Sequence, residues 1–143
     1  MTHGFDTSFL VAAEILGHAH HEASRLRLQA LRSRGDDFAI APQVLAEFVH
    51  VVTDGNRFSE PLSTDAALSR AEIWWTSGEV MQVLPTPATL QEFFKWMRHY
   101  GLGRKCILDT LLAATYKVAG IGSVLTLDAR GFAVFDAFQV TTP

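Results

Sequence analysis

The amino-acid sequence predicts a three-layer α/β domain, with a mostly parallel central sheet covered by helices on both faces. Short segments of strand-like composition alternate with longer segments whose apolar residues recur at helical spacing. Turn-forming clusters separate these segments at short intervals, and there is no internal repeat or linker. Strands that alternate with helices in this way form parallel sheets that are buried on both faces.

The first strand is expected at 3–5, and it leads into the apolar run "TSFLVAAEIL", which is typical of a helix. A second helix is expected from about His20 to the segment "LRSRG". Arginines occupy the last turn of this helix and Gly35 follows them, as is common where helices end. The second strand is expected at 38–41.

The middle of the chain continues the alternation. The segment "PQVLAEFVHVV" at 42–52 is apolar around much of a helix circumference. In the next helical segment, Leu68, Ala71 and Trp75 fall on one face. Thr64 is a candidate N-cap for that helix.

The last part of the chain predicts two further helices and three strands. Leu90, Phe93, Phe94 and Met97 follow the i, i+3, i+4, i+7 spacing of an amphipathic helix. The segment "CILDTLLAATYKVAG" is also expected to be helical, and "DARGF" begins as a turn. The strands are expected at 80–84, 123–127 and 138–142.

Length and composition fit one domain that spans residues 1–143. Hydrophobic residues make up 48% of the chain and charged residues 19%, which is typical of folded rather than disordered proteins. No apolar run is long enough to span a bilayer, and no secretion signal opens the sequence. The single cysteine, Cys106, allows no intramolecular disulfide, so the cytoplasm is the expected location.

Four acidic residues lie in unusual places. Asp6 follows the first strand, Asp128 ends the fourth, and Glu47 lies one turn into the helix after the second strand. Asp109 enters the helix that leads to the Asp128 strand. Each acid also has a structural interpretation. Asp6 and Asp109 could be N-caps, Asp109 could pair with Lys105, and Asp128 could be a turn residue. Glu47 could lie at a solvated boundary, although its apolar neighbours favour a partly buried carboxylate that needs a partner.

The combination of the four acids carries more weight than any one of them. In a parallel sheet, these positions can all face the edge formed by the carboxyl ends of the strands. Clustered carboxylates repel one another, so some become protonated or a cation neutralises them. A set of oxygen ligands without sulfur favours a hard ion, Mg²⁺ or Mn²⁺.

The order "DTSFL", "LAEF", "LDTLLAA" and "TLDARGF" resembles the PIN domain, and more narrowly the VapC-type ribonuclease toxins of bacterial toxin–antitoxin pairs. The likeness covers nearly the whole chain. It implies a PIN-like fold in which Asp6, Glu47, Asp109 and Asp128 are catalytic and bind Mg²⁺ or Mn²⁺ to cleave RNA. Ser8 and Thr126 match small hydroxyl residues of the family beside the first and last acids, where they would support the site through hydrogen bonds.

The resemblance further implies partners. Such toxins are typically homodimers that a cognate antitoxin protein holds inactive by covering the acidic groove. A catalytically silent module that binds RNA or protein is an alternative, and metal binding without RNA cleavage would favour it. A phosphohydrolase with Asp6 as nucleophile is a third possibility, but position 8 is Ser where a D-x-D pattern requires an acid.

The net charge of −3 limits how the chain could bind RNA. Proteins that hold nucleic acid by charge alone are usually basic, so this chain would need bridging cations or local basic groups. Arg104, Lys105 and Arg130 lie near acids of the quartet and could contact phosphate, or they could be solvated surface charges.

The segment "GHAHHE" brings three histidines close together in the sequence. These histidines could suggest a transition-metal site, but a polar helix start is the simpler interpretation, because a cluster alone implies no ligand geometry.

Overall fold

The computed structural model describes residues 1–143, and its centre is a five-stranded sheet in the order β3-β2-β1-β4-β5. Every neighbouring pair of strands is parallel. This arrangement confirms the predicted α/β class. The strands are β1 (Thr2–Phe5), β2 (Asp37–Ile40), β3 (Val80–Gln82), β4 (Ser123–Leu125) and β5 (Gln139–Thr141).

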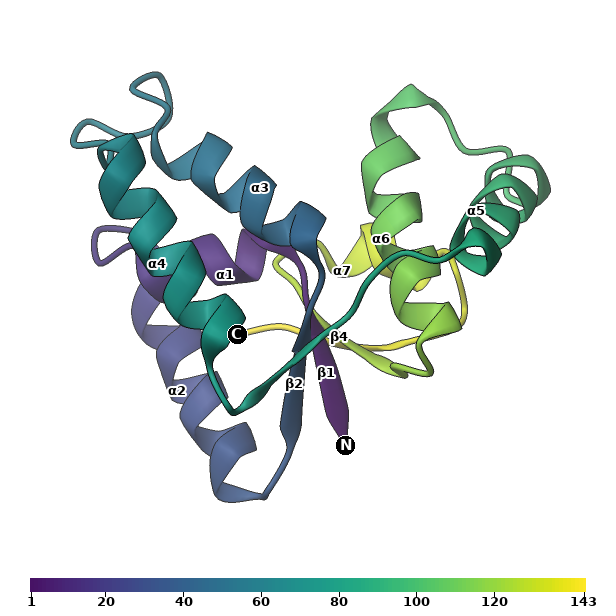
Figure 1. Ribbon diagram of the computed structural model, residues 1–143, viewed down its shortest axis with the longest axis horizontal. Coiled ribbons are helices and arrows are strands. Elements are labelled where there is room, and N and C mark those ends of the chain that lie inside the picture. The colour runs from purple at the N-terminus through teal and green to yellow at the C-terminus, as the bar shows by residue number, and fades with distance from the viewer.

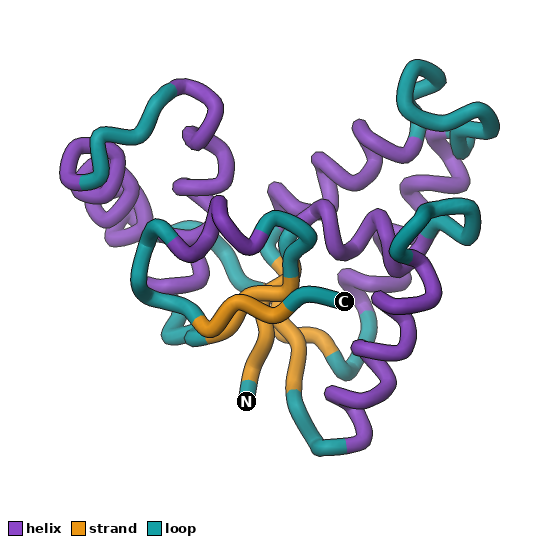
Figure 2. The backbone as a smooth tube through the Cα atoms, turned by 180° about the vertical axis from the view of Figure 1, so that it is seen from behind, coloured by secondary structure: helices purple, strands orange, loops and turns teal.

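Seven α-helices and one 3₁₀ turn connect the strands. Helices α1 to α4 lie on one side of the sheet and α5 to α7 on the other, which gives the three predicted layers (Figures 1 and 2). None of these helices combines the length and the apolar character that a membrane span requires. The elements are α1 (Thr7–Glu14), α2 (His21–Ser33), α3 (Pro42–Val52), α4 (Thr64–Thr76), α5 (Pro87–His99), the 3₁₀ turn η1 (Arg104–Cys106), α6 (Ile107–Val118) and α7 (Ala129–Ala133).

A close contact between α6 and β1 sets the position of the two elements. Tyr116 on α6 is fully buried, and its hydroxyl donates to the Phe5 carbonyl at 2.6 Å. The Tyr116 ring lies against Gly4, where an added Cβ atom would come within 2.6 Å of it. Because position 4 has no side chain, α6 packs directly on the strand that ends beside Asp6.

The strands at 80–84 and 123–127 are predicted two residues too long at their carboxyl ends. For β4 the reason is visible. After Leu125, the Thr126 hydroxyl turns to the Asp6 carboxylate, and the Leu127 N–H donates to the Ser8 hydroxyl at 3.0 Å instead of to a strand. The chain therefore leaves the sheet at the point where the acidic residues begin.

Helix α5 is present, and its apolar stripe is only partly buried: Phe93 and Met97 are half-buried. Phe94 is 49% exposed and Leu90 is 39% exposed, whereas Trp96 and Thr89 are buried. Trp96 stacks on Phe135 with ring centroids 4.8 Å apart, and this contact turns α5 so that Trp96 faces the domain. In α4 the N-cap is also one residue earlier than predicted, because Ser63, not Thr64, accepts from a helical N–H.

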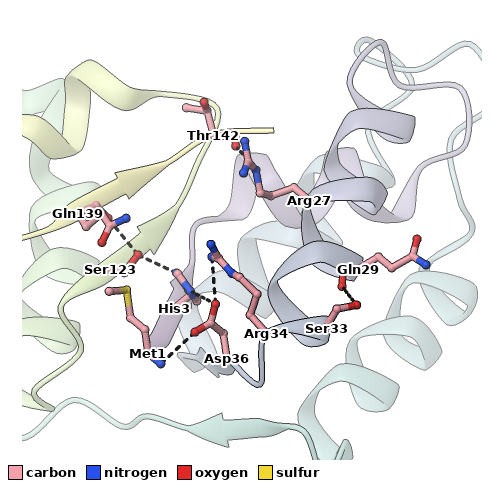
Figure 3. A network of polar contacts seen from close by, with 10 residues as sticks. All are labelled: Met1, His3, Arg27, Gln29, Ser33, Arg34, Asp36, Ser123, Gln139 and Thr142. Carbon is pink, nitrogen blue, oxygen red and sulfur yellow. Dashed lines mark hydrogen bonds and ion pairs between the residues drawn. The ribbon is translucent and has the colours of Figure 1, made fainter.

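A polar network holds the amino ends of the strands together (Figure 3). The Met1 ammonium group and Arg34 contact the two oxygens of Asp36 at 3.0 and 3.1 Å. His3 Nδ1 lies 2.7 Å from the Ser123 hydroxyl, which joins β1 to β4. His3 Nε2 has only Asp36 nearby, at 3.5 Å, and burial lowers the pKa of His3 below its usual 6.5.

Candidate metal-dependent active site

All four acids of the predicted quartet line one cavity of about 480 Å³. Asp6 and Asp128 follow β1 and β4, while Glu47 lies on α3 and Asp109 on α6. The carboxyl ends of the two strands point to the space between α3 and α6 (Figure 1). The cavity thus lies at the edge of the sheet where the sequence places it.

Asp6 occupies the N-cap position of α1, but its side chain does not cap the helix. Its Oδ2 atom instead accepts hydrogen bonds from the Ser8 hydroxyl at 2.6 Å and the Thr126 hydroxyl at 2.7 Å. These hydroxyls accept in turn from the N–H groups of Leu127 and Asp128. Asp6 is only 7% exposed, and no protein group donates to its Oδ1, which leaves that oxygen free for a ligand.

Glu47 differs from the expectation of a partly buried carboxylate, because it is exposed on α3. It does have a partner: the buried Thr7 hydroxyl donates to Glu47 Oε2 at 2.9 Å. Thr7 adjoins Asp6 in sequence, and its contact with Glu47 was not predicted. No local pattern signals a contact between residues that lie 40 positions apart.

Asp109 lies in the first turn of α6, which begins at Ile107 rather than after the acid. No ion pair joins it to Lys105. Burial, followed by the charges of Asp6, Glu47 and Asp128 in that order, raises the pKa of Asp109 to about 6. The other three carboxylates are therefore close enough to disfavour the charge of Asp109.

Asp128 is both a turn residue and part of the acidic cavity. It is the N-cap of α7, and its Oδ1 accepts from the Gly131 N–H at 3.0 Å. Its other oxygen, Oδ2, accepts no protein hydrogen bond. An added Cβ atom at Gly131 would lie 2.6 Å from Oδ2, so a side chain at this position would displace the Asp128 carboxylate.

The donor chemistry of the cavity fits a hard divalent cation, although the ligands are not preassembled. None of the four acids forms an ion pair with Arg, Lys or His, so their negative charge is uncompensated by the protein. All four offer oxygen ligands, which Mg²⁺ and Mn²⁺ prefer. No three acidic, histidine or cysteine side chains already stand at metal-binding distance from a common point.

The cations predicted to contact phosphate do not line this cavity. Arg104 and Lys105 lie in the exposed η1 turn before α6, and Arg130 is exposed on α7. The cation that does line the cavity is Arg57, from the loop between α3 and α4, and the sequence analysis does not single it out.

A parallel α/β domain with an acidic cavity at the carboxyl ends of its central strands is a frequent design for metal-assisted chemistry. Within that class, the chain belongs to the PIN domain family, whose model matches residues 5–137. A comparison with curated proteins gives no match.

Solved structures of bacterial toxins share the fold. The chain is similar to VapC20 of Mycobacterium tuberculosis, described as a sarcin–ricin loop cleaving toxin, with a TM-score of 0.74, 22% identity and 100% of both chains covered. It is also similar to a chain of Rickettsia felis VapBC2 bound to promoter DNA, with a TM-score of 0.69, 17% identity and 100% and 99% covered. For FitAcB of Neisseria gonorrhoeae the TM-score is 0.65, with 19% identity and 98% and 96% covered.

Proposed function

We propose that this protein is a Mg²⁺- or Mn²⁺-dependent endoribonuclease and the toxin of a bacterial type II toxin–antitoxin pair. The observation that carries the proposal is the cavity shared by four carboxylates without a cationic partner. Membership of the PIN domain family supports it, as does the similarity of the fold to that of toxins such as VapC20.

The proposed roles follow from where each side chain lies. Asp6, Asp109 and Asp128 would hold the cation, since each lines the cavity and Asp6 Oδ1 and Asp128 Oδ2 have no protein partner. Glu47, fixed by Thr7, would orient the attacking water and accept its proton. A bound divalent ion would supply Lewis-acid activation of the phosphate and neutralise developing charge.

The cation also accounts for how an acidic chain could hold a polyanion. The net charge is −3, and the carboxylates of the cavity would repel phosphate on their own. With the ion in place, the same carboxylates would hold the polyanion through the ion.

The proposed protein partners are a cognate antitoxin and a second copy of the chain. Two of the similar structures are named as the pairs VapBC2 and FitAcB, which supports an antitoxin partner for this chain. The acidic cavity would be the surface that such an antitoxin covers.

The decisive experiment is induced expression followed by sequencing of cellular RNA ends. New RNA ends that require intact Asp6 are expected, and the Asp6→Asn variant should give none while keeping its fold. Substitution of an exposed acid outside the cavity, Asp65→Asn, is the matched control and should cleave like the wild type. Equal cleavage by Asp6→Asn and the wild type would refute the proposal.

A catalytically silent module that binds RNA or protein is the second candidate. It is favoured by one observation, the absence of three acidic side chains already at metal-binding distance. Calorimetric titration with Mn²⁺ alongside the cleavage assay separates the two functions, because ion binding without new RNA ends fits only the silent module.

A further inference from the structure

Two loops complete the acidic cavity with groups that the proposed chemistry does not use. His18 comes from the loop between α1 and α2, and Arg57 and Phe58 come from the loop between α3 and α4. All three line the same cavity as the four acids. They place an imidazole, a guanidinium group and an aromatic ring beside the site.

The loop that carries Arg57 and Phe58 is internally braced. The N–H groups of both residues donate to the Asp54 carbonyl at 3.1 Å, and the Asn56 N–H donates to the Asp54 side chain at 2.8 Å. The Leu62 N–H closes the loop on the Val52 carbonyl at 2.9 Å. The backbone that carries the two side chains is thus fixed by hydrogen bonds within the loop.

Arg57 has N–H donors that no protein acceptor contacts. Only its Nε faces a protein acceptor, Asp54 Oδ2 at 3.5 Å, so its two terminal amino groups have no partner. Phe58 packs partly against the hydrophobic core and partly faces the cavity. A free guanidinium fork is suited to phosphate, and an exposed aromatic face is suited to a nucleobase.

His18 adds an oriented donor. Its Nδ1 atom accepts from the His20 N–H at 3.0 Å, so in the neutral ring the proton is on Nε2. No protein group accepts from Nε2. Burial, followed by the nearby His20 and His21, lowers the pKa of His18, which keeps the ring in this neutral form.

The cavity has room for more than an ion. Six waters around a divalent cation occupy about 180 Å³, at about 30 Å³ for each water. The cavity volume is about 480 Å³, so more than half of it remains for groups of a larger ligand.

We infer that Arg57, Phe58 and His18 form a subsite for a nucleotide of single-stranded RNA next to the phosphate that is cleaved. Arg57 binds a backbone phosphate, Phe58 stacks on the base, and His18 Nε2–H donates to a phosphate or ribose oxygen. This inference rests on the proposed function and deepens it, because it assigns the substrate to the α1–α2 and α3–α4 loops. The RNA strand therefore does not run along Arg104 and Lys105, the cations of η1.

The test compares Arg57→Gln and Phe58→Leu with the wild type. Binding of a fluorescein-labelled RNA stem–loop with a randomised loop is followed by anisotropy in Ca²⁺, and cleavage of total cellular RNA is followed in Mn²⁺. Each substitution should weaken RNA binding about tenfold, through loss of a charged hydrogen bond or of base stacking. Arg57→Gln should also lower the slope of log affinity against log salt by about 0.7.

The controls separate binding from folding and from catalysis. Arg98→Gln removes an exposed arginine of α5 outside the cavity and should leave RNA affinity unchanged. Mn²⁺ affinity should not fall in Arg57→Gln, Phe58→Leu or Arg98→Gln, and Arg57→Lys should recover part of the RNA affinity. Lost Mn²⁺ affinity in Arg57→Gln and Phe58→Leu would overturn the inference, because it would mean that these residues support the fold or the ion site.

Other outcomes also decide the matter. Arg57→Gln could leave RNA affinity unchanged while joint substitution of Arg104 and Lys105 by Gln lowers it. That result would overturn the inference and place the RNA strand on the other side of the cavity. Wild-type affinity and cleavage in both loop variants would overturn the inference. If the wild type binds RNA but does not cleave it, the nuclease proposal is wrong. The RNA affinities of the variants would still decide whether the subsite exists.

Discussion

At the scale of single residues, hydroxyl groups organise the candidate site as much as the acids do. Asp6 accepts from Ser8 and Thr126, and Glu47 accepts from Thr7. A carboxylate held through one oxygen keeps its orientation before any ion arrives, which lowers the cost of ordering it on binding. In the proposed metal site, the hydroxyls would therefore contribute to ion affinity without touching the ion.

Removing one hydroxyl should show this contribution. Thr126→Val keeps the shape of the side chain but deletes its hydrogen bond to Asp6. Mn²⁺ affinity, measured by calorimetry, is expected to fall about tenfold or more. Thr142→Val changes an exposed threonine outside the cavity and serves as control. Equal Mn²⁺ affinity of Thr126→Val and the wild type would contradict this role.

Asp109 should make the ion-free protein less stable as the pH rises. Its folded-state pKa is about 6 against an ordinary 3.8, so the folded chain binds the proton more tightly and loses stability between these values. Asp109→Asn is expected to raise the free energy of unfolding at pH 7.5 by about 1 kcal/mol, after allowance for solvent screening. The gain should shrink towards pH 4, as urea unfolding with EDTA present would reveal. A gain that is constant with pH would rule out this explanation.

The acids of the site are predictable from the sequence, because parallel strands bring their carboxyl ends to one edge. Their convergence needs no knowledge of the connecting loops. Thr7 and Arg57 are not predictable in this way. Thr7 acts on a residue 40 positions away, and Arg57 reaches the cavity only because a loop folds back on itself.

At the scale of elements, the packing of α6 on β1 positions the site. Asp109 and Tyr116 lie on α6 two turns apart, so the contact of Tyr116 with Gly4 fixes the height of Asp109 beside Asp6. The same contact therefore sets both the position of α6 and the position of the Asp109 carboxylate.

Gly4→Ala should test this constraint. The new Cβ atom would meet the Tyr116 ring at 2.6 Å, so the helix or the ring must shift. A loss of about 1–3 kcal/mol in the free energy of unfolding is expected, measured with urea. At Gly122 an added Cβ atom meets nothing within 4 Å, so Gly122→Ala is the control and should be near neutral. Similar stabilities of the two variants would show that α6 tolerates displacement.

The existence of the strands and helices follows from composition and spacing, but the face that a helix buries does not always follow. The apolar stripe of α5 that includes Phe94 looks like a core face, yet Trp96 takes that place. The contact of Trp96 with Phe135 joins residues from separate elements, and its stacking overrides the local pattern.

At the scale of the whole molecule, the two ends of the sheet have opposite responses to pH. The carboxyl end carries Asp109, with a raised pKa, and the amino end carries buried His3, with a lowered pKa. For His3 the unfolded chain binds the proton more tightly, so its contribution to stability is present above pH 6.5 and is lost as the pH falls through the folded pKa.

The His3 contribution can be isolated in an Asp109→Asn background. There, the free energy of unfolding should rise between about pH 5 and pH 7. His3→Asn in the same background keeps a donor towards Ser123 and should reduce that rise, to which His18 also contributes through its lowered pKa. Thermal unfolding at a series of pH values gives the slopes, and identical slopes with and without His3 would contradict the assignment.

Helices α3 and α6 stand on opposite layers and are fastened to each other near the sheet, where Gln43 Nε2 donates to the Thr115 hydroxyl at 3.1 Å. Glu47 lies one turn beyond Gln43 on α3, and Asp109 lies on the facing part of α6. An ion held by Asp109, with its attacking water held by Glu47, would form a second link between the two halves of the molecule. Ion binding would then couple the two helical layers, which would unfold in one cooperative transition rather than in two.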